Sequence, residues 1–267
     1  YDQLIQEQLV GQPNAVNAYI ECCQRYVGLQ KTALIWEGKN GESEQWSFEQ
    51  LDVASAQLAN YFKSIGIQVG DCIAGLLPRT PELLITILAT WRIGAIYQPL
   101  FTAFESKAIE HRVLTANTKL IVTNAEQRPK LNHVEVKHIL TVNAGTNLTS
   151  NEADFWQEAK QQSDQCEAVL RSFDDDFLMM FTSGTTGLAK SVPVPLKAVL
   201  AFKGYMQHAV DLREDDSFWN LADPGWAYGL YYGITGPLSL GHSIIMDERT
   251  FSVDHAVEVI KKYRVSN

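Results

Sequence analysis

The stretch that decides the fold is residues 47–99, SFEQLDVASAQLANYFKSIGIQVGDCIAGLLPRTPELLITILATWRIGAIYQP. Ser47 and Gln50 form a capping-box pattern ahead of apolar residues at helical spacing, which predicts a helix over 47–66. The short apolar run 72–77 is typical of a strand buried on both faces. Pro81 then opens a second helix that reaches Arg92, and a strand follows over 95–99. A helix and a strand therefore alternate twice within about 50 residues.

The same alternation continues along the rest of the chain. It predicts a helix over 105–116, strands at 119–123 and 138–142, and a polar, irregular connection over 143–176 in which 152–162 could be helical. Further elements are predicted at 177–182 (strand), 191–194 (strand), 196–210 (helix), 217–221 (strand), 229–238 (helix), 242–246 (strand) and 252–264 (helix). Such an order is the signature of an α/β fold with parallel sheets wrapped by helices, whose ligands bind at the carboxyl ends of the strands. We expect two α/β subdomains, 1–174 and 175–267, the second of them incomplete.

Composition restricts the class of partner. The formal net charge is −9, with 22 Lys and Arg against 31 Asp and Glu. Nucleic-acid and anionic-membrane surfaces need an excess of basic residues, so we expect small-molecule partners and neither of those surfaces. Four cysteines, without CxxC or metal-ligand spacing, predict neither a disulfide framework nor a zinc site, and favour a reducing cytoplasm. The sequence contains no leader pattern and no apolar run of about 18 residues.

The most informative segment follows the predicted strand 177–182. It reads Thr182-Ser183-Gly184-Thr185-Thr186-Gly187-Leu188-Ala189-Lys190. Glycines let the backbone approach an anion, hydroxyl groups donate hydrogen bonds to phosphate oxygens, and lysine adds a positive charge on a flexible stem. We therefore expect Thr182, Ser183, Gly184, Thr185, Thr186, Gly187 and Lys190 to bind the phosphates of ATP. An ordinary Gly- and Ser-rich surface loop is the alternative.

A P-loop NTPase is a second alternative, because residues 184–191 nearly match the Walker pattern GxxxxGK[ST]. Ala189 stands where that pattern needs glycine. A Walker lysine also begins a helix, whereas Pro193 and Pro195 favour an extended segment here.

Residues 182–190 resemble the phosphate-loop motif TSGTTGxPK of the acyl-adenylate-forming, AMP-binding superfamily, with Ala189 in place of proline. Ser191, Val194 and Leu196 depart from residues that are common just after the motif. Two further stretches resemble acetyl-CoA synthetase and related short- to medium-chain acyl-CoA ligases: GAIYQPLFTAF at 94–104, and ADPGW at 222–226 followed by YYGITGPL at 231–238. The resemblance runs from about residue 30 to the end of the sequence.

This resemblance implies an ATP-dependent carboxylic acid:CoA ligase. A carboxylate attacks the α-phosphate of Mg²⁺-bound ATP to give acyl-AMP and pyrophosphate, and the thiolate of CoA then displaces AMP. It also implies that Trp226, Ala227 and Tyr228 shape the acyl pocket, and that Phe101, Phe104 and Arg128 face CoA. The structural alternatives are a core aromatic for Trp226 and a solvated surface residue for Arg128.

The resemblance places other parts of the machinery outside these 267 residues. They are the adenine- and Mg²⁺-binding motif, the ribose-binding aspartate, and a mobile C-terminal lid domain that carries the adenylation lysine. We therefore assign no catalytic and no metal-binding residue. We expect the sequence to be the N-terminal part of a longer ligase that is inactive alone, with a nucleotide-binding or interaction module without catalysis as the alternative.

Overall fold

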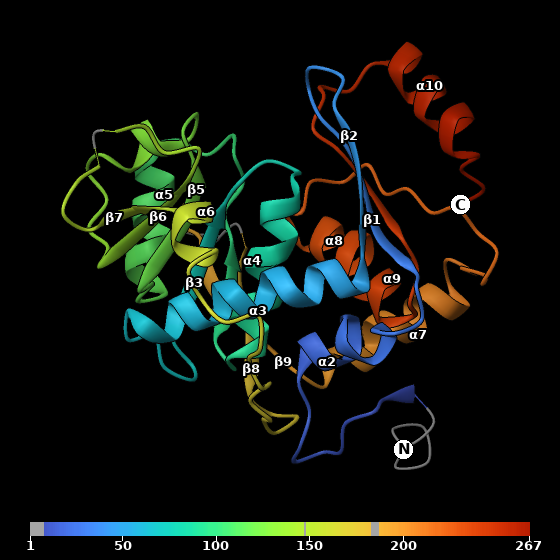
Figure 1. Ribbon diagram of the computed structural model, residues 1–267, viewed down its shortest axis with the longest axis horizontal. Helices are drawn as coiled ribbons and strands as arrows, with labels where there is room; N and C mark the ends of the chain where they lie inside the picture. Colours follow the sequence, from blue (N-terminus) through green and yellow to red (C-terminus); the bar gives the residue numbers. More distant parts are fainter. Residues whose placement is uncertain (1–7, 147, 183–186) are drawn as a thin grey trace.

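The computed structural model describes residues 8–146, 148–182 and 187–267 (Figure 1). Its strands form two sheets. The larger sheet has seven strands in the order β7 (Glu152–Asp154), β6 (His138–Val142), β5 (Leu120–Asn124), β3 (Cys72–Leu76), β4 (Ile96–Pro99), β8 (Asp176–Thr182) and β9 (Lys190–Pro195). The smaller sheet has three strands in the order β10 (Ile244–Asp247), β1 (Thr32–Glu37) and β2 (Ser43–Ser47).

Helices connect and cover these strands. The α-helices are α2 (Ala18–Cys22), α3 (Phe48–Ser64), α4 (Pro81–Arg92), α5 (Ser106–Thr115), α6 (Phe155–Ala159), α7 (Ala198–His208), α8 (Ala227–Leu230), α9 (Gly236–Ser239) and α10 (Val253–Tyr263). The described residues also form two 3₁₀ turns, η1 (Gln24–Tyr26) and η2 (Arg128–Leu131), and a π-helical turn, η3 (Tyr231–Thr235). Helix α10 lies at the edge of the molecule, away from the seven-stranded sheet (Figure 1).

The decisive stretch folds as its pattern predicts. Ser47 caps α3 with a complete capping box: its side chain accepts from the Gln50 N–H, and the Gln50 side chain accepts from the Ser47 N–H. Pro81 begins α4, which is buried along almost its whole length. A helix that is apolar all round belongs in the interior, and α4 packs against both α3 and α2.

Alternating side chains divide the core between the two faces of the large sheet. Ile73 and Leu120 belong to the main apolar cluster with α3 and α4, whereas their neighbours Ala74 and Ile121 pack with α5 on the opposite face. Successive side chains of a strand point to opposite faces, so a strand covered on both sides is apolar throughout. The α/β class with helices on both faces of a parallel-rich sheet is confirmed.

Strand direction sets where ligands can enter. The pairs β3–β4, β3–β5, β4–β8, β5–β6 and β6–β7 are parallel, so the carboxyl ends of these strands share one edge of the sheet. Only at the margin does the direction change, since β9 pairs antiparallel with β8. In the smaller sheet β1 pairs antiparallel with β2 and parallel with β10.

Several expected elements differ in the structure. Residues 217–221 are not a strand; their backbone bonds to residues 266 and 267 span too few positions for a ladder. The possible helix at 152–162 is a short strand, β7, followed by the one-turn helix α6. The helix expected at 229–238 extends over 227–239, with a π-helical turn in its middle.

Both sheets combine strands from either side of residue 174, because β4 pairs with β8 and β1 pairs with β10. The division into subdomains 1–174 and 175–267 therefore stays a prediction. None of the helices in the described ranges is long and apolar enough to cross a membrane.

Candidate functional site

The candidate phosphate loop is the connection of a β-hairpin. Strand β8 ends at Thr182, β9 begins at Lys190, and the two residues are direct partners across the antiparallel ladder. Ser183, Gly184, Thr185 and Thr186 lie outside the described residues. At the other end of the loop, Gly187 has a φ of +90°, a conformation that favours glycine, and an added Cβ would meet nothing within 4 Å.

This geometry agrees with the extended segment predicted after Lys190 and argues against a Walker loop. Lys190 begins a strand, whereas the Walker lysine begins a helix. Pro193 and Pro195 fit because β9 is the edge strand of its sheet, where a missing N–H breaks no internal ladder. The side chains of both Thr182 and Lys190 are exposed at the carboxyl end of β8. A hydroxyl and an ammonium group thus lie side by side on an open edge, which suits a polyphosphate ligand.

Helix α5 adds two groups beside the hairpin that sequence reasoning missed. Nε2 of His111 is 2.8 Å from the carbonyl oxygen of Ala189 and ties the returning part of the loop to α5. The guanidinium of Arg112 lies 4.1 Å from the ring centroid of Phe104 and 5.6 Å from that of Phe181 in β8. Burial lowers the pKa of Arg112, yet an arginine remains charged at neutral pH. No motif marks these two residues, because α5 reaches the hairpin only in the folded chain.

Three aromatic side chains predicted to face two different ligands lie together. Phe101 and Phe104 follow β4, and their rings lie 5.5 and 5.6 Å from the ring of Trp226. The two phenylalanines contact each other edge to face at 5.6 Å. Trp226 is 46% exposed, so it is no buried core residue and forms the surface of an aromatic wall. Through Arg112, this wall connects to the β8–β9 hairpin.

Close backbone approach holds Trp226 in place. A Cβ added to Gly225 would lie 2.6 Å from Cα of Phe101, so only glycine lets the ADPGW segment pack against the end of β4. The backbone N–H of Gly225 donates to the Asp223 carboxylate at 2.7 Å. Burial raises the pKa of Asp223, while that hydrogen bond and Arg79 oppose the rise.

The remaining predicted residues lie in different surroundings. Ala227 is half-buried against the main core, and Tyr228 is 52% exposed with its ring 5.2 Å from that of Tyr232. Arg128 binds other groups: its guanidinium forms an ion pair with Glu152 at 2.9 Å and donates a hydrogen bond to Asn132. Glu152 is nearly buried, so this pair has a structural role whether or not Arg128 also faces CoA.

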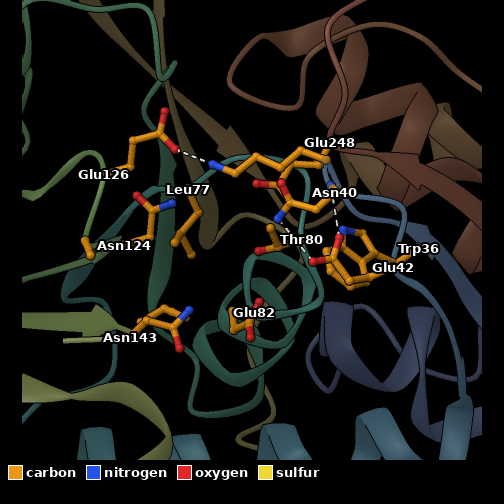
Figure 2. Close-up of a pocket in the computed structure, with 13 residues that line it drawn as sticks. Trp36, Asn40, Glu42, Leu77, Thr80, Glu82, Asn124, Glu126, Asn143 and Glu248 are labelled. Atoms are coloured by element: carbon orange, nitrogen blue, oxygen red, sulfur yellow. Dashed lines mark hydrogen bonds and ion pairs between the residues drawn. The ribbon is translucent and has the colours of Figure 1, made fainter. Parts of the chain in front are cut away.

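A cavity of about 320 Å³ opens at the other half of the same sheet edge (Figure 2). The segments after β3, β5 and β6 form one side, and the β1–β2 turn and Glu248 form the other. Its charged lining residues are Lys39, Glu42, Glu82, Glu126 and Glu248. The glutamates outnumber the single lysine, and Lys39 is already paired with Glu126 at 2.7 Å. This lining is unsuited to phosphate groups.

The acidic lining does not indicate a metal site either. Within the described ranges, no three His, Cys, Asp or Glu side chains converge so as to hold a metal ion. Burial raises the pKa of Glu248, and the neighbouring charges of Glu126 and Glu42 add to the rise although Lys39 opposes it.

Comparisons with known proteins agree with this geometry. A family model described as AMP-binding enzyme matches residues 22–266. The crystal structure of a Brucella canis acyl-CoA synthetase matches with a TM-score of 0.94 and 47% identity, covering 99% of this chain and 51% of that one. Acetyl-coenzyme A synthetase of Deinococcus radiodurans is 33% identical over 266 residues, which cover 89% of this chain and 40% of the relative. The corresponding protein of Xylella fastidiosa is 30% identical, with 94% and 43% covered. The chain thus spans about two fifths of the length of these curated relatives.

Proposed function

Because the chain belongs to the AMP-binding enzyme family, we propose that the whole protein is an ATP-dependent carboxylic acid:CoA ligase that forms an acyl-adenylate. The observation that carries the proposal is the β8–β9 hairpin, which sets Lys190 opposite Thr182 at the carboxyl end of β8. The similarity to acyl-CoA and acetyl-CoA synthetases supports the same reaction class.

In the first step, a carboxylate oxygen forms a bond to the α-phosphorus of ATP, and the bond to pyrophosphate breaks. We propose that Thr182, Gly187 and Lys190, together with the undescribed residues 183–186, hold the β- and γ-phosphates. A fixed positive charge beside the leaving pyrophosphate stabilises the charge that develops on it. The contact between His111 and Ala189 fixes the backbone next to Lys190, so that less reorganisation of this residue is needed when ATP binds.

In the second step, the thiolate sulfur of CoA bonds to the acyl carbon and AMP leaves. We propose that Phe101 and Phe104 face CoA, while Trp226, Ala227 and Tyr228 face the acid. The contact of Trp226 with both phenylalanines supports this arrangement, because acid and thiol must meet at one point. A CoA contact for Arg128 stays a prediction.

Mg²⁺ would enter with ATP and neutralise part of the phosphate charge. The resemblance assigns its ligands, and those of adenine and ribose, to no residue of this chain. We propose that the 267 residues alone complete neither step efficiently. We further propose a cytoplasmic location, which the four unpaired, buried cysteines support.

The test is carboxylate-dependent exchange of pyrophosphate into ATP by the protein as its gene encodes it, with acids from acetate to octanoate. Lys190→Ala should lower the exchange rate by about 100-fold or more, as loss of a charge-stabilising group commonly does. Lys39→Ala, at the acidic cavity, is the matched control and should change the rate less than about 2-fold. If none of the carboxylates supports exchange, the ligase proposal is overturned and a nucleotide-binding module remains. The 267-residue chain, assayed in parallel, should show little exchange.

A further inference from the structure

A pocket of about 390 Å³ lies beside the helix that Trp226 opens. Its lining includes the rings of Phe218, Trp219, Tyr228 and Tyr232, with the amide of Asn220 among them. The lining also includes Asn267, and none of the described side chains that line the pocket is charged. The pocket thus differs sharply from the acidic cavity, whose lining is dominated by carboxylates.

Two tyrosines, Tyr228 and Tyr232, line one wall of this pocket, and Tyr205 packs against Tyr232. Tyr205 of α7 and Tyr232 of η3 have ring centroids 4.1 Å apart, and Tyr228 of α8 meets Tyr232 at 5.2 Å with the ring planes inclined by 67°. Tyr228 is held against Tyr232 by this ring contact, while half of its surface is exposed. A ring fixed in this way keeps its face and edge available to a ligand.

The π-helical turn carries two adjacent tyrosines that both pack against the main core. Tyr231 stacks on Phe202 at 4.2 Å, whereas Tyr232 meets Phe202 edge to face at 6.0 Å and also contacts Tyr205 and Tyr228. The hydroxyl of Thr235 donates to the carbonyl of Leu230 at 2.9 Å, across the width of the turn. π-Helical turns are rare and occur frequently at functional sites.

We propose that this pocket receives the acyl portion of the acid, and that the preferred acid is a monocarboxylate with an aromatic ring and not acetate. The inference rests on the proposed ligase function and names its substrate class. Aromatic pairs favour edge-to-face and offset contacts that a saturated ring cannot reproduce, which corresponds to about 2- to 10-fold in affinity for a pair. The uncharged lining disfavours an acid whose far end carries a second carboxylate, because that charge would lose its hydration without a partner.

The experiment compares acids of matched size in the exchange assay with the protein as its gene encodes it: benzoate, cyclohexanecarboxylate, terephthalate and acetate. Benzoate should exceed cyclohexanecarboxylate in kcat/KM by about 2- to 10-fold, exceed acetate, and exceed terephthalate by more than about 10-fold. Tyr228→Leu should bring the ratio of benzoate to cyclohexanecarboxylate close to one. Tyr228→Phe, which keeps the ring, should retain that ratio even if loss of the hydroxyl group lowers both rates.

The outcomes separate the two proposals. Exchange with acetate and little with benzoate would overturn the aromatic-acid inference and leave the ligase standing. An unchanged ratio in Tyr228→Leu would overturn the assignment of this pocket. If neither these four acids nor any acid from acetate to octanoate supports exchange, the ligase function itself is overturned. Thermal unfolding of each variant is measured alongside, and the ratio of two acids on one variant is independent of the fraction folded.

Discussion

At one end of the carboxyl edge of the seven-stranded sheet, Lys190 and Arg112 lie beside an aromatic wall. At the other end, glutamates outnumber the single lysine around a cavity of about 320 Å³ (Figure 2). Both ends are built from strands with the same direction, so backbone topology alone makes either a candidate ligand site. The side chains after each strand decide between them. A polyphosphate is compatible with the first end, called the phosphate end, and disfavoured at the second, called the acidic end.

After the two lysines, the largest difference between the two ends should come from their tryptophans. Trp226→Ala removes the ring that contacts both Phe101 and Phe104, and with it the surface that positions the acid near the thiol. We expect kcat/KM for the acid to fall at least about 10-fold, because small losses of positioning are costly to rate. Trp36→Ala, in the acidic cavity, should change it less than about 2-fold. Rates are measured below the unfolding temperature of both variants.

Equal losses in the two tryptophan variants would break the comparison. They would mean that the acidic cavity takes part in the reaction, or that both substitutions act through the stability of the fold. Urea unfolding of each variant distinguishes these causes, since only the second predicts matching losses of unfolding free energy.

The next test concerns the source of positive charge at the phosphate end. Arg112 lies over the ring of Phe104 and has its side chain half-buried. Arg112→Gln should raise KM for ATP by about 3- to 10-fold, through loss of a desolvated cation near the hairpin and of its contact with the ring. Arg112→Lys keeps the charge and should recover part of the loss. A KM for ATP that is unchanged in Arg112→Gln would confine this residue to packing.

The phosphate end was also the more predictable from sequence. The motif at 182–190 and the prolines of β9 predicted an extended segment after a loop, and the hairpin has that form. His111 and Arg112 were not predicted, because their place at the hairpin depends on how α5 crosses the sheet. Caps and apolar spacing likewise predicted α3 and α4 closely, since those signals are local.

Elements whose existence depends on distant partners were missed or wrongly assigned. Strands β1 and β2 were not predicted, and β1 pairs with β10 about 200 residues later in the chain. The apolar segment 217–221 has strand-like residues but bonds across a short span to residues 266 and 267, and it stays irregular. The acidic cavity has the same origin: its glutamates come from the β1–β2 turn, α4 and the segments after β5 and β10, and no spacing in the sequence groups them.

The smallest effect should appear as a pH dependence of stability at the acidic end. Burial and the charges of Glu126 and Glu42 raise the pKa of Glu248 above its ordinary value of 4.5. Between the unfolded and folded pKa values the folded protein binds the proton more tightly, so this group lowers stability as pH rises through that interval. Above it, the loss is constant. Glu248→Gln should therefore stabilise the protein at pH 8, by no more than about 0.5 kcal/mol because the site is partly solvated, and should give no advantage at pH 4.

Urea unfolding at the two pH values measures this gain, with Glu135→Gln as the control on an exposed surface. The control should show no difference between pH 4 and pH 8 relative to the parent protein. If Glu248→Gln were instead destabilising at pH 8, the carboxylate would be a net attractive partner of Lys39, and the cavity would be balanced in charge. A gain confined to pH 8 would agree with a Glu248 carboxylate that loses hydration in the folded protein and is repelled by Glu126 and Glu42, in a cavity unsuited to phosphate.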